Sequence, residues 1–93
     1  MSELTMYAGT VEYLRATLTA DVDLVDQPVE FSFDRVTWSA GEWDGAVGPT
    51  RTARLLVGGA GVPMPPKGSR SVFVRLTDFP EIPVMRAGTL IVS

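Results

Sequence analysis

The chain has 93 residues, of which 45% are hydrophobic, and a formal net charge of −3. This length fits one domain with one modest core, and the apolar content excludes a disordered tail. The acidic balance argues against nucleic-acid binding, which needs a basic face, and no apolar run approaches the length of a membrane span.

The N-terminal part of the chain predicts one regular strand. Residues 1–9 have no firm period and are expected to form an N-terminal arm or an edge strand, ahead of a single domain over residues 10–93. Residues 10–20 alternate between apolar and polar side chains. The residues on their apolar face are Leu14, Ala16 and Leu18. A helix is conceivable there, but the threonines favour a strand. Residues 21–27 are expected to form an acidic turn.

Residues 28–43, PVEFSFDRVTWSAGEW, are the most regular part of the chain. One face of the expected strand over residues 29–33 carries Val29, Phe31 and Phe33. The other face carries Glu30, Ser32 and Asp34. This strict alternation is typical of a half-buried antiparallel strand. Residues 34–37 are expected to turn, and residues 38–43 to include a short strand that breaks at Gly41.

The second half of the chain predicts three more strands, over residues 51–57, 71–77 and 84–93. The connections between them are expected to be loops over residues 44–50, 58–68 and 78–83. The middle loop is too rich in glycine and proline for a regular element. About six or seven short strands, separated by turn signals every 8–12 residues or so, predict an all-β fold: an antiparallel β-sandwich of immunoglobulin-like type.

The chain contains neither cysteine nor histidine. Disulfides, thiolate catalysis and cysteine-based zinc sites are therefore impossible. The usual general base near neutral pH is missing, so a Ser-His-Asp or Cys-His site cannot be built. A Ser-Lys pair would have to use Lys67, the only lysine, which is better explained as a solvated loop residue. We therefore expect no enzyme activity and no cofactor.

An acidic run offers the one arrangement with a metal-binding pattern. Asp21, Asp23 and Asp26 could supply oxygen ligands to calcium, but the run lacks the glycine and the distal glutamate of an EF-hand loop. Aspartate also caps turns through its own backbone, which explains most of the acidic residues without a metal. The run therefore predicts no metal site, although it leaves calcium open.

Aromatic and arginine side chains are the candidate contacts with a partner. One of Trp38 and Trp43 is expected in the core, and the other could stack on a sugar or on a partner protein. Phe73 and Tyr13 point away from the predicted core and would form an exposed apolar patch if they lay on one sheet. The loop over residues 58–68 and the arm over residues 1–9 are the expected contact elements. Deletion of residues 60–67 is expected to leave folding intact but to weaken assembly. The full set of interface candidates is Tyr13, Trp38, Trp43, Met64, Lys67, Arg70, Phe73 and Arg75.

Two runs of the chain resemble a known class of protein. PVEFSFDRVTW, residues 28–38, resembles the strand-turn-tryptophan motif of small immunoglobulin-like domains in tailed-phage virions. GSRSVFVRLTDFPEIPVMRAGTLIV, residues 68–92, is similar to the closing hairpin of such domains. Comparable proteins are the small accessory, decoration or tail proteins of actinobacterial phages and the N-terminal modules of baseplate proteins. The two runs cover about a third to a half of the chain.

The resemblance implies a structural or adhesive role on a virion, without catalysis. Such a protein would be a capsid decoration, head–tail or tail component, bound to other virion proteins and to copies of itself. The residues themselves leave an alternative open, a carbohydrate- or cell-surface-binding module that uses Trp38 or Trp43 as a stacking platform for a glycan. No nucleic-acid or membrane partner is expected.

Overall fold

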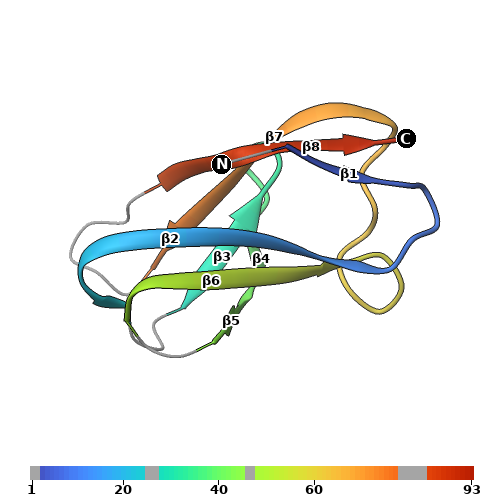
Figure 1. Cartoon of the computed structure of the whole chain (residues 1–93). Helices are drawn as coiled ribbons and strands as arrows, with labels where there is room; N and C mark the ends of the chain where they lie inside the picture. Colours follow the sequence, from blue (N-terminus) through green and yellow to red (C-terminus); the bar gives the residue numbers. More distant parts are fainter. Residues whose placement is uncertain (1–2, 25–27, 46–47, 78–83) are drawn as a thin grey trace.

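The computed structural model describes residues 3–24, 28–45, 48–77 and 84–93, without the side chains of residues 20–24. The described residues form two β-sheets and no helix (Figure 1). The strands are β1 (Glu3–Met6), β2 (Glu12–Leu24), β3 (Val29–Ser32), β4 (Ser39–Ala40), β5 (Glu42–Asp44), β6 (Gly48–Val57), β7 (Gly68–Leu76) and β8 (Val84–Val92). The all-β prediction is confirmed, with eight strands in place of the expected six or seven.

One sheet has five strands in the order β1-β8-β7-β3-β4, and the other has three in the order β2-β6-β5. Strands β2 to β7 pair only in antiparallel fashion, whereas β8 pairs antiparallel with β7 and parallel with β1. The expectation of a purely antiparallel fold is therefore wrong at this edge. Of the two options for the N-terminal residues, the structure has the edge strand, over Glu3–Met6.

Strand β2 forms where a helix was conceivable. It pairs with β6 in an unbroken antiparallel register from Glu12↔Val57 to Thr19↔Thr50. Its β-branched threonines face outward, where they suit a pleated surface. The strand runs on to Leu24, so the turn expected over residues 21–27 is wrong for its first four residues, and residues 25–27 lie outside the described part.

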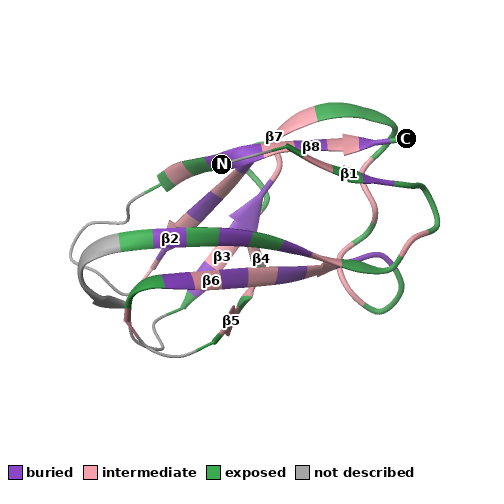
Figure 2. Ribbon diagram, in the orientation of Figure 1, coloured by how far each residue is buried: buried purple, intermediate pink, exposed green. Residues whose placement is uncertain are grey.

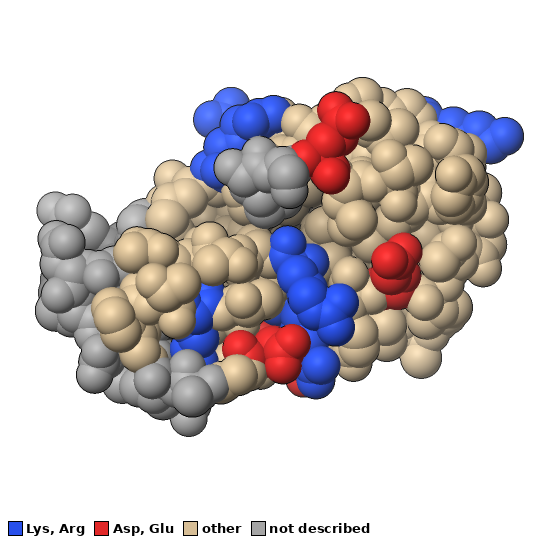
Figure 3. Space-filling model, viewed as in Figure 1, with Lys and Arg blue, Asp and Glu red and all other residues tan. Residues whose placement is uncertain are grey.

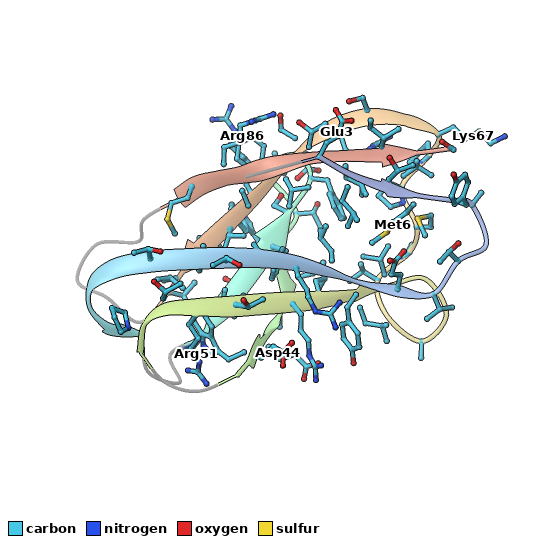
Figure 4. The ribbon with its side chains drawn as sticks, in the orientation of Figure 1. Glu3, Met6, Asp44, Arg51, Lys67 and Arg86 are labelled. Carbon is cyan, nitrogen blue, oxygen red and sulfur yellow. The ribbon has the colours of Figure 1, made fainter. Side chains whose placement is uncertain are left out.

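Both sheets contribute to one hydrophobic core. Its buried residues are Met6, Leu14, Ala16, Leu18, Val29, Phe31, Ala53, Leu55, Val57, Val72, Val74, Leu76, Ala87, Leu90 and Val92. The burial alternates along the strands, as Figure 2 shows for β2 and β6. Figure 4 shows Met6 pointing into the space between the two sheets. The predicted inward faces of residues 10–20, 51–57 and 71–77 are thereby confirmed.

The chain changes sheets at Gly41, which separates β4 from β5. A Cβ atom there would lie 2.7 Å from Cε1 of Phe31 and 2.9 Å from the carbonyl oxygen of Arg54. Only glycine fits such a close approach without displacing backbone or core. The predicted break at Gly41 is confirmed, and its physical reason is this crossing over the buried Phe31 ring.

The connections differ from expectation in two places. The loop expected over residues 44–50 is shorter, because β5 includes Asp44 and β6 begins at Gly48. Residues 58–68 are largely irregular, but Gly68 already belongs to β7. The loop expected over residues 78–83 lies outside the described residues.

Candidate functional site

Of the eight predicted contact residues, four lie on the outer faces of the two sheets and two lie in the loop over residues 58–68. The other two, Trp43 and Arg70, lie on β5 and β7. Trp38, Phe73 and Arg75 gather on the outer face of the five-stranded sheet. Tyr13 lies on β2, on the outer face of the three-stranded sheet. Phe73 and Tyr13 therefore belong to different sheets, and the shared apolar patch that they would form on one sheet does not exist.

Arg75 is the centre of the first cluster. It lies on β7 directly opposite Glu30 on β3, and its Nε donates a hydrogen bond to Oε1 of that glutamate at 2.8 Å. Its guanidinium carbon also lies 4.2 Å from the centroid of the Trp38 ring. Both charged side chains keep about a quarter of their surface exposed. The planar guanidinium is thus held by a carboxylate and a ring while part of the group faces solvent.

Phe73 extends the same cluster, because it lies two residues before Arg75 on β7 and so shares its face. The guanidinium of Arg35 covers its ring at 5.1 Å from the centroid. Arg35 adopts a φ of 63°, the one positive value found at a non-glycine residue of the described chain. Such a left-handed residue is uncommon and needs support from its surroundings.

A network of side-chain hydrogen bonds supplies that support. The Ser32 hydroxyl accepts from the backbone N–H of Arg35 at 2.8 Å and donates to Oδ1 of Asp34 at 2.9 Å. The same carboxylate oxygen accepts from the N–H groups of Val36 and Thr37, each at 2.8 Å. Thr37 and Val36, with a smaller contribution from Ser32, lower the pKa of Asp34 from its ordinary value of 3.8.

This network corrects one expectation from the sequence. Ser32 was expected on the outward face of its strand, yet it is 1% exposed, because the following turn folds back over it. The turn over residues 34–37 itself is confirmed. We call the cluster of Glu30, Arg35, Trp38, Phe73 and Arg75 the Arg–aromatic face. Arg86 lies beside it on β8 and donates to the hydroxyls of Ser71 and Thr89.

A similar group lies on the outer face of the three-stranded sheet. Arg54 on β6 donates from Nε to Oε1 of Glu42 at 2.9 Å, and its guanidinium carbon lies 4.4 Å from the Tyr13 ring centroid. Arg15 lies 5.6 Å from the same ring and 3.6 Å from Oδ2 of Asp44. In Figure 3 basic and acidic groups lie side by side near the lower centre of this surface.

Trp43 points inward and does not belong to either outer cluster. It packs against the hydrophobic core from β5, opposite Ala53. The guanidinium carbon of Arg51 lies 4.9 Å from its ring centroid, and Arg51 donates to the carbonyl of Gly45 at 3.3 Å. Trp43 is therefore a structural residue, and Trp38 is the tryptophan on an outer face.

The loop over residues 58–68 is anchored at its centre and open at its end. Val62 and Met64 pack against the core, and the N–H of Val62 donates to the carbonyl of Leu56. Lys67 is exposed and points away from the body of the molecule in Figure 4. Deletion of residues 60–67 would remove both of these core contacts, and the expectation that folding survives it stays a prediction.

Arg70 and Met64 line a shallow groove between this loop and the turn after β3. The groove has a volume of about 350 Å³, and Phe33 and Asp34 line its other side. Arg70 donates from Nη2 to the carbonyl of Pro66 at 2.7 Å, while its buried Nε has no hydrogen-bond partner among the described residues. A second hollow of about 340 Å³ lies over Gly41 and Gly61.

The described residues contain no group of three or more His, Cys, Asp or Glu side chains that could hold a metal ion. The calcium hypothesis concerns residues beyond that description, since Asp26 and the side chains of Asp21 and Asp23 are outside it. Within the described ranges, no helix has the length and apolar character needed to span a membrane.

Sequence reasoning named Trp38, Phe73 and Arg75 but missed Glu30 and Arg35. Glu30 had a usable signal, because it alternates outward on the same strand that carries Phe31. No family model, no curated protein and no solved structure matches the chain significantly. Function therefore has to be inferred from the residues and their geometry.

Proposed function

We propose that the two sheets form an immunoglobulin-like β-sandwich. The order β2-β6-β5 corresponds to strands B, E and D of that fold, and β3, β7 and β8 correspond to C, F and G, with β4 as an added strand beside C. Phe31 on β3 is 1% exposed and occupies the core position where antibody domains carry a tryptophan. Strand order and this buried aromatic support the proposal.

On this scaffold we propose a non-enzymatic role in protein–protein assembly, as a capsid decoration, head–tail or tail component of a tailed-phage virion. The partners would be other virion proteins and further copies of the chain. The virion setting comes from the resemblance of residues 28–38 and 68–92 to phage domains. The assembly role is supported by the Arg–aromatic face, which presents the residue types that dominate protein interfaces.

One observation carries the assembly proposal: Arg75 is held by Glu30 at 2.8 Å and by the Trp38 ring at 4.2 Å. A guanidinium fixed in this way loses little side-chain entropy when a partner binds, so its remaining donors are already oriented. Arg35 is oriented similarly, because the Ser32–Asp34 turn holds its backbone in the left-handed region. Preorganised arginine and aromatic groups on an outer face suit recognition better than catalysis.

Arg75→Ala and Arg54→Ala form a matched pair of variants for the test. Each arginine donates Nε to a glutamate at 2.8 or 2.9 Å and stacks on an aromatic ring, but the two lie on different sheets. We expect tagged Arg75→Ala to enter phage particles at least about tenfold less than the unchanged chain, and Arg54→Ala to enter normally. Thermal unfolding of both variants checks that each remains folded.

Mass spectrometry of purified particles, from the phage genome that encodes the chain, tests the virion setting directly. Absence of the chain from those particles would contradict it. Equal incorporation of the two arginine variants would contradict the assignment to the Arg–aromatic face, even if the chain is a virion component.

A carbohydrate- or cell-surface-binding role is the second candidate, and Trp38 is the observation that favours it. Its ring lies on an outer face next to the polar groups of Arg75 and Glu30, a combination that can stack on a sugar and bind its hydroxyls. A Trp43→Phe variant leaves Trp38 as the only tryptophan reporter. Titration with polysaccharides should then shift its fluorescence, and an unchanged spectrum with every polysaccharide would remove this candidate.

A further inference from the structure

The four outer edges of the two sheets differ in length. Strands β1, β4 and β5 have four, two and three residues, whereas β2 has 13. Short edge strands protect a sheet from pairing with other chains, because they offer few free N–H and C=O groups. Only β2 among the described edges presents a long row of such groups.

The first part of β2 also lacks several of the devices that usually protect an edge, although it carries the charged residues Glu12 and Arg15. Its register with β6 is unbroken over residues 12–19, and the irregularity comes only after Thr19. These eight residues include no proline, glycine or lysine. No strand within the described residues lies on the other side of β2. The free edge is therefore flat and regular over about 26 Å, at roughly 3.3 Å per residue.

We propose that this edge pairs with the same edge of a second copy of the chain, antiparallel and centred on Ala16. The pair joins two three-stranded sheets into one continuous six-stranded sheet with β2 strands at its centre. The proposal deepens the assembly role above, on which it rests, by naming one interface and its partner. A two-fold axis through Ala16 makes the interface isologous, as in most homodimers.

The inward side chains of β2 favour a second copy over an unrelated strand. Leu14, Ala16 and Leu18 are 0%, 1% and 8% exposed and read the same in both directions. Antiparallel pairing about Ala16 places Leu14 opposite the partner's Leu18, and Ala16 opposite its own copy. Over these three residues the apolar layer continues across the interface, which favours a stable register. The next position on the same face is Glu12, which this register places opposite the partner's Ala20.

The outward side chains fit the same register. Arg15 faces the partner's Thr17, and no charged residue of β2 faces a like charge directly. The Thr17 hydroxyl is 3.2 Å from that of Thr52 on β6, and a hydroxyl keeps a free acceptor site after one such bond. The Arg15 guanidinium lies 3.6 Å from Asp44 on β5, so it has to turn from that carboxylate toward the free edge to donate to the partner's Thr17.

Sedimentation equilibrium of the purified chain, with a matched pair of variants, tests the pairing. The unchanged chain should show twice its mass of 10.0 kDa. Thr17→Lys and Thr52→Lys both remove the same Thr17–Thr52 hydroxyl bond and add one lysine to the same face. Only Thr17→Lys puts the charge on the free edge, opposite the partner's Arg15. We expect it to weaken dimerisation at least about tenfold, and Thr52→Lys to leave it within about threefold.

A charge reversal tests the register. In the double variant Arg15→Glu with Thr17→Lys, each glutamate faces a lysine of the partner, so the dimer should regain most of its affinity. A monomeric double variant would overturn the register about Ala16.

Because the chain has no cysteine, a mixture of Arg15→Cys and Thr17→Cys chains offers a second check. Mild oxidation should link the two variants to each other, since opposite residues lie within about 5.5 Å between Cα atoms.

Two outcomes would overturn the pairing outright. One is a wild-type chain that stays monomeric up to about millimolar concentration, and the other is a dimer that Thr17→Lys and Thr52→Lys weaken equally. These outcomes are separate from failure of the proposed function. A monomer that is found in particles would contradict the pairing alone, and a β2-paired dimer absent from particles would contradict the virion role alone.

Discussion

Two irregular segments of the chain, the turn over residues 33–38 and the loop over residues 58–68, are held in place by different forces. The turn is fixed by hydrogen bonds from the Ser32 hydroxyl and the Asp34 carboxylate to the backbone. The loop is fixed by apolar packing of Val62 and Met64 and by a close approach of backbone at Gly58. The first depends on a charge and the second does not.

The loop is therefore less free to serve as a contact element than its composition suggests, and the turn presents the contact residue Arg35. The loop was a preferred candidate from the sequence, yet its residues Val62 and Met64 pack against the core. The short turn looked like a mere connection, but it orients Arg35 over Phe73. Composition indicates that a segment is irregular. Whether the segment is mobile depends on what its side chains and backbone touch.

The largest expected effect comes from Gly58→Ala, with Gly9→Ala as its control. Both glycines have nearly the same left-handed backbone, with φ of 86° and 85°. A Cβ at Gly9 meets nothing within 4 Å, whereas at Gly58 it would overlap the carbonyl oxygen of Thr10. We expect Gly9→Ala to cost about 1–2 kcal/mol of unfolding free energy, and Gly58→Ala to cost about 1–3 kcal/mol more.

Urea unfolding of the two variants measures this difference. Equal losses of stability would mean that the loop yields easily at Gly58, and that the close approach to Thr10 does not hold it. The loop would then not be fixed by this backbone contact.

Much of the fold could be predicted from the period of the sequence, and its exceptions have physical causes. Alternation identified the inward faces of β2, β6 and β7, because a half-buried strand needs a side-chain period of two. Alternation says nothing of which strands pair. It could not show that β1 runs parallel to β8, or that the chain changes sheets at Gly41. Those features depend on contacts between residues far apart in sequence.

The candidate site was predictable only in part. Phe73 and Arg75 were recognisable as large side chains on an outward face. Trp38 was only one of two tryptophans, and the sequence left open which of them lies in the core. Glu30 was recognisable only as an outward residue of its strand, and Arg35 not at all, because a charged residue in such a position is usually just solvated. Arg35 reaches Phe73 because its own backbone is left-handed, and that conformation depends on the buried Ser32. No local sequence pattern predicts this geometry.

Met64→Ala has the next largest expected effect, and Lys67→Ala in the same loop is its control. Met64 is half-buried against the core, so its truncation should cost about 1–2 kcal/mol, less than for a fully buried methionine. Lys67 is exposed, and its truncation should change stability by less than about 0.5 kcal/mol. Both values come from urea unfolding at neutral pH. Similar values for the two variants would indicate that the loop is not anchored at Met64.

The smallest expected effect is a change of stability with pH, which arises from the turn and not from the loop. Hydrogen bonds from Thr37 and Val36 lower the pKa of Asp34 in the folded chain below its ordinary value of 3.8. A lowered folded-state pKa stabilises the fold above the unfolded-state pKa, and this contribution is lost as the pH falls through the folded-state value. The difference in unfolding free energy between the wild type and Asp34→Asn should therefore be present at pH 7 and disappear below about pH 4.

Unfolding of the wild type, Asp34→Asn and Asp44→Asn at a series of pH values from 7 to 2 measures this effect. Asp44→Asn removes one charge from an exposed pair with Arg15 and leaves every hydrogen bond of the turn intact, so it corrects for the change in net charge. Met64→Ala should lose the same free energy at every pH at which the chain folds, because its packing involves no charge. A gap between wild type and Asp34→Asn that stays constant with pH would mean that neutral hydrogen bonds alone hold the turn. Arg35 would then keep its place over Phe73 in acid, and the two segments would no longer differ in the force that fixes them.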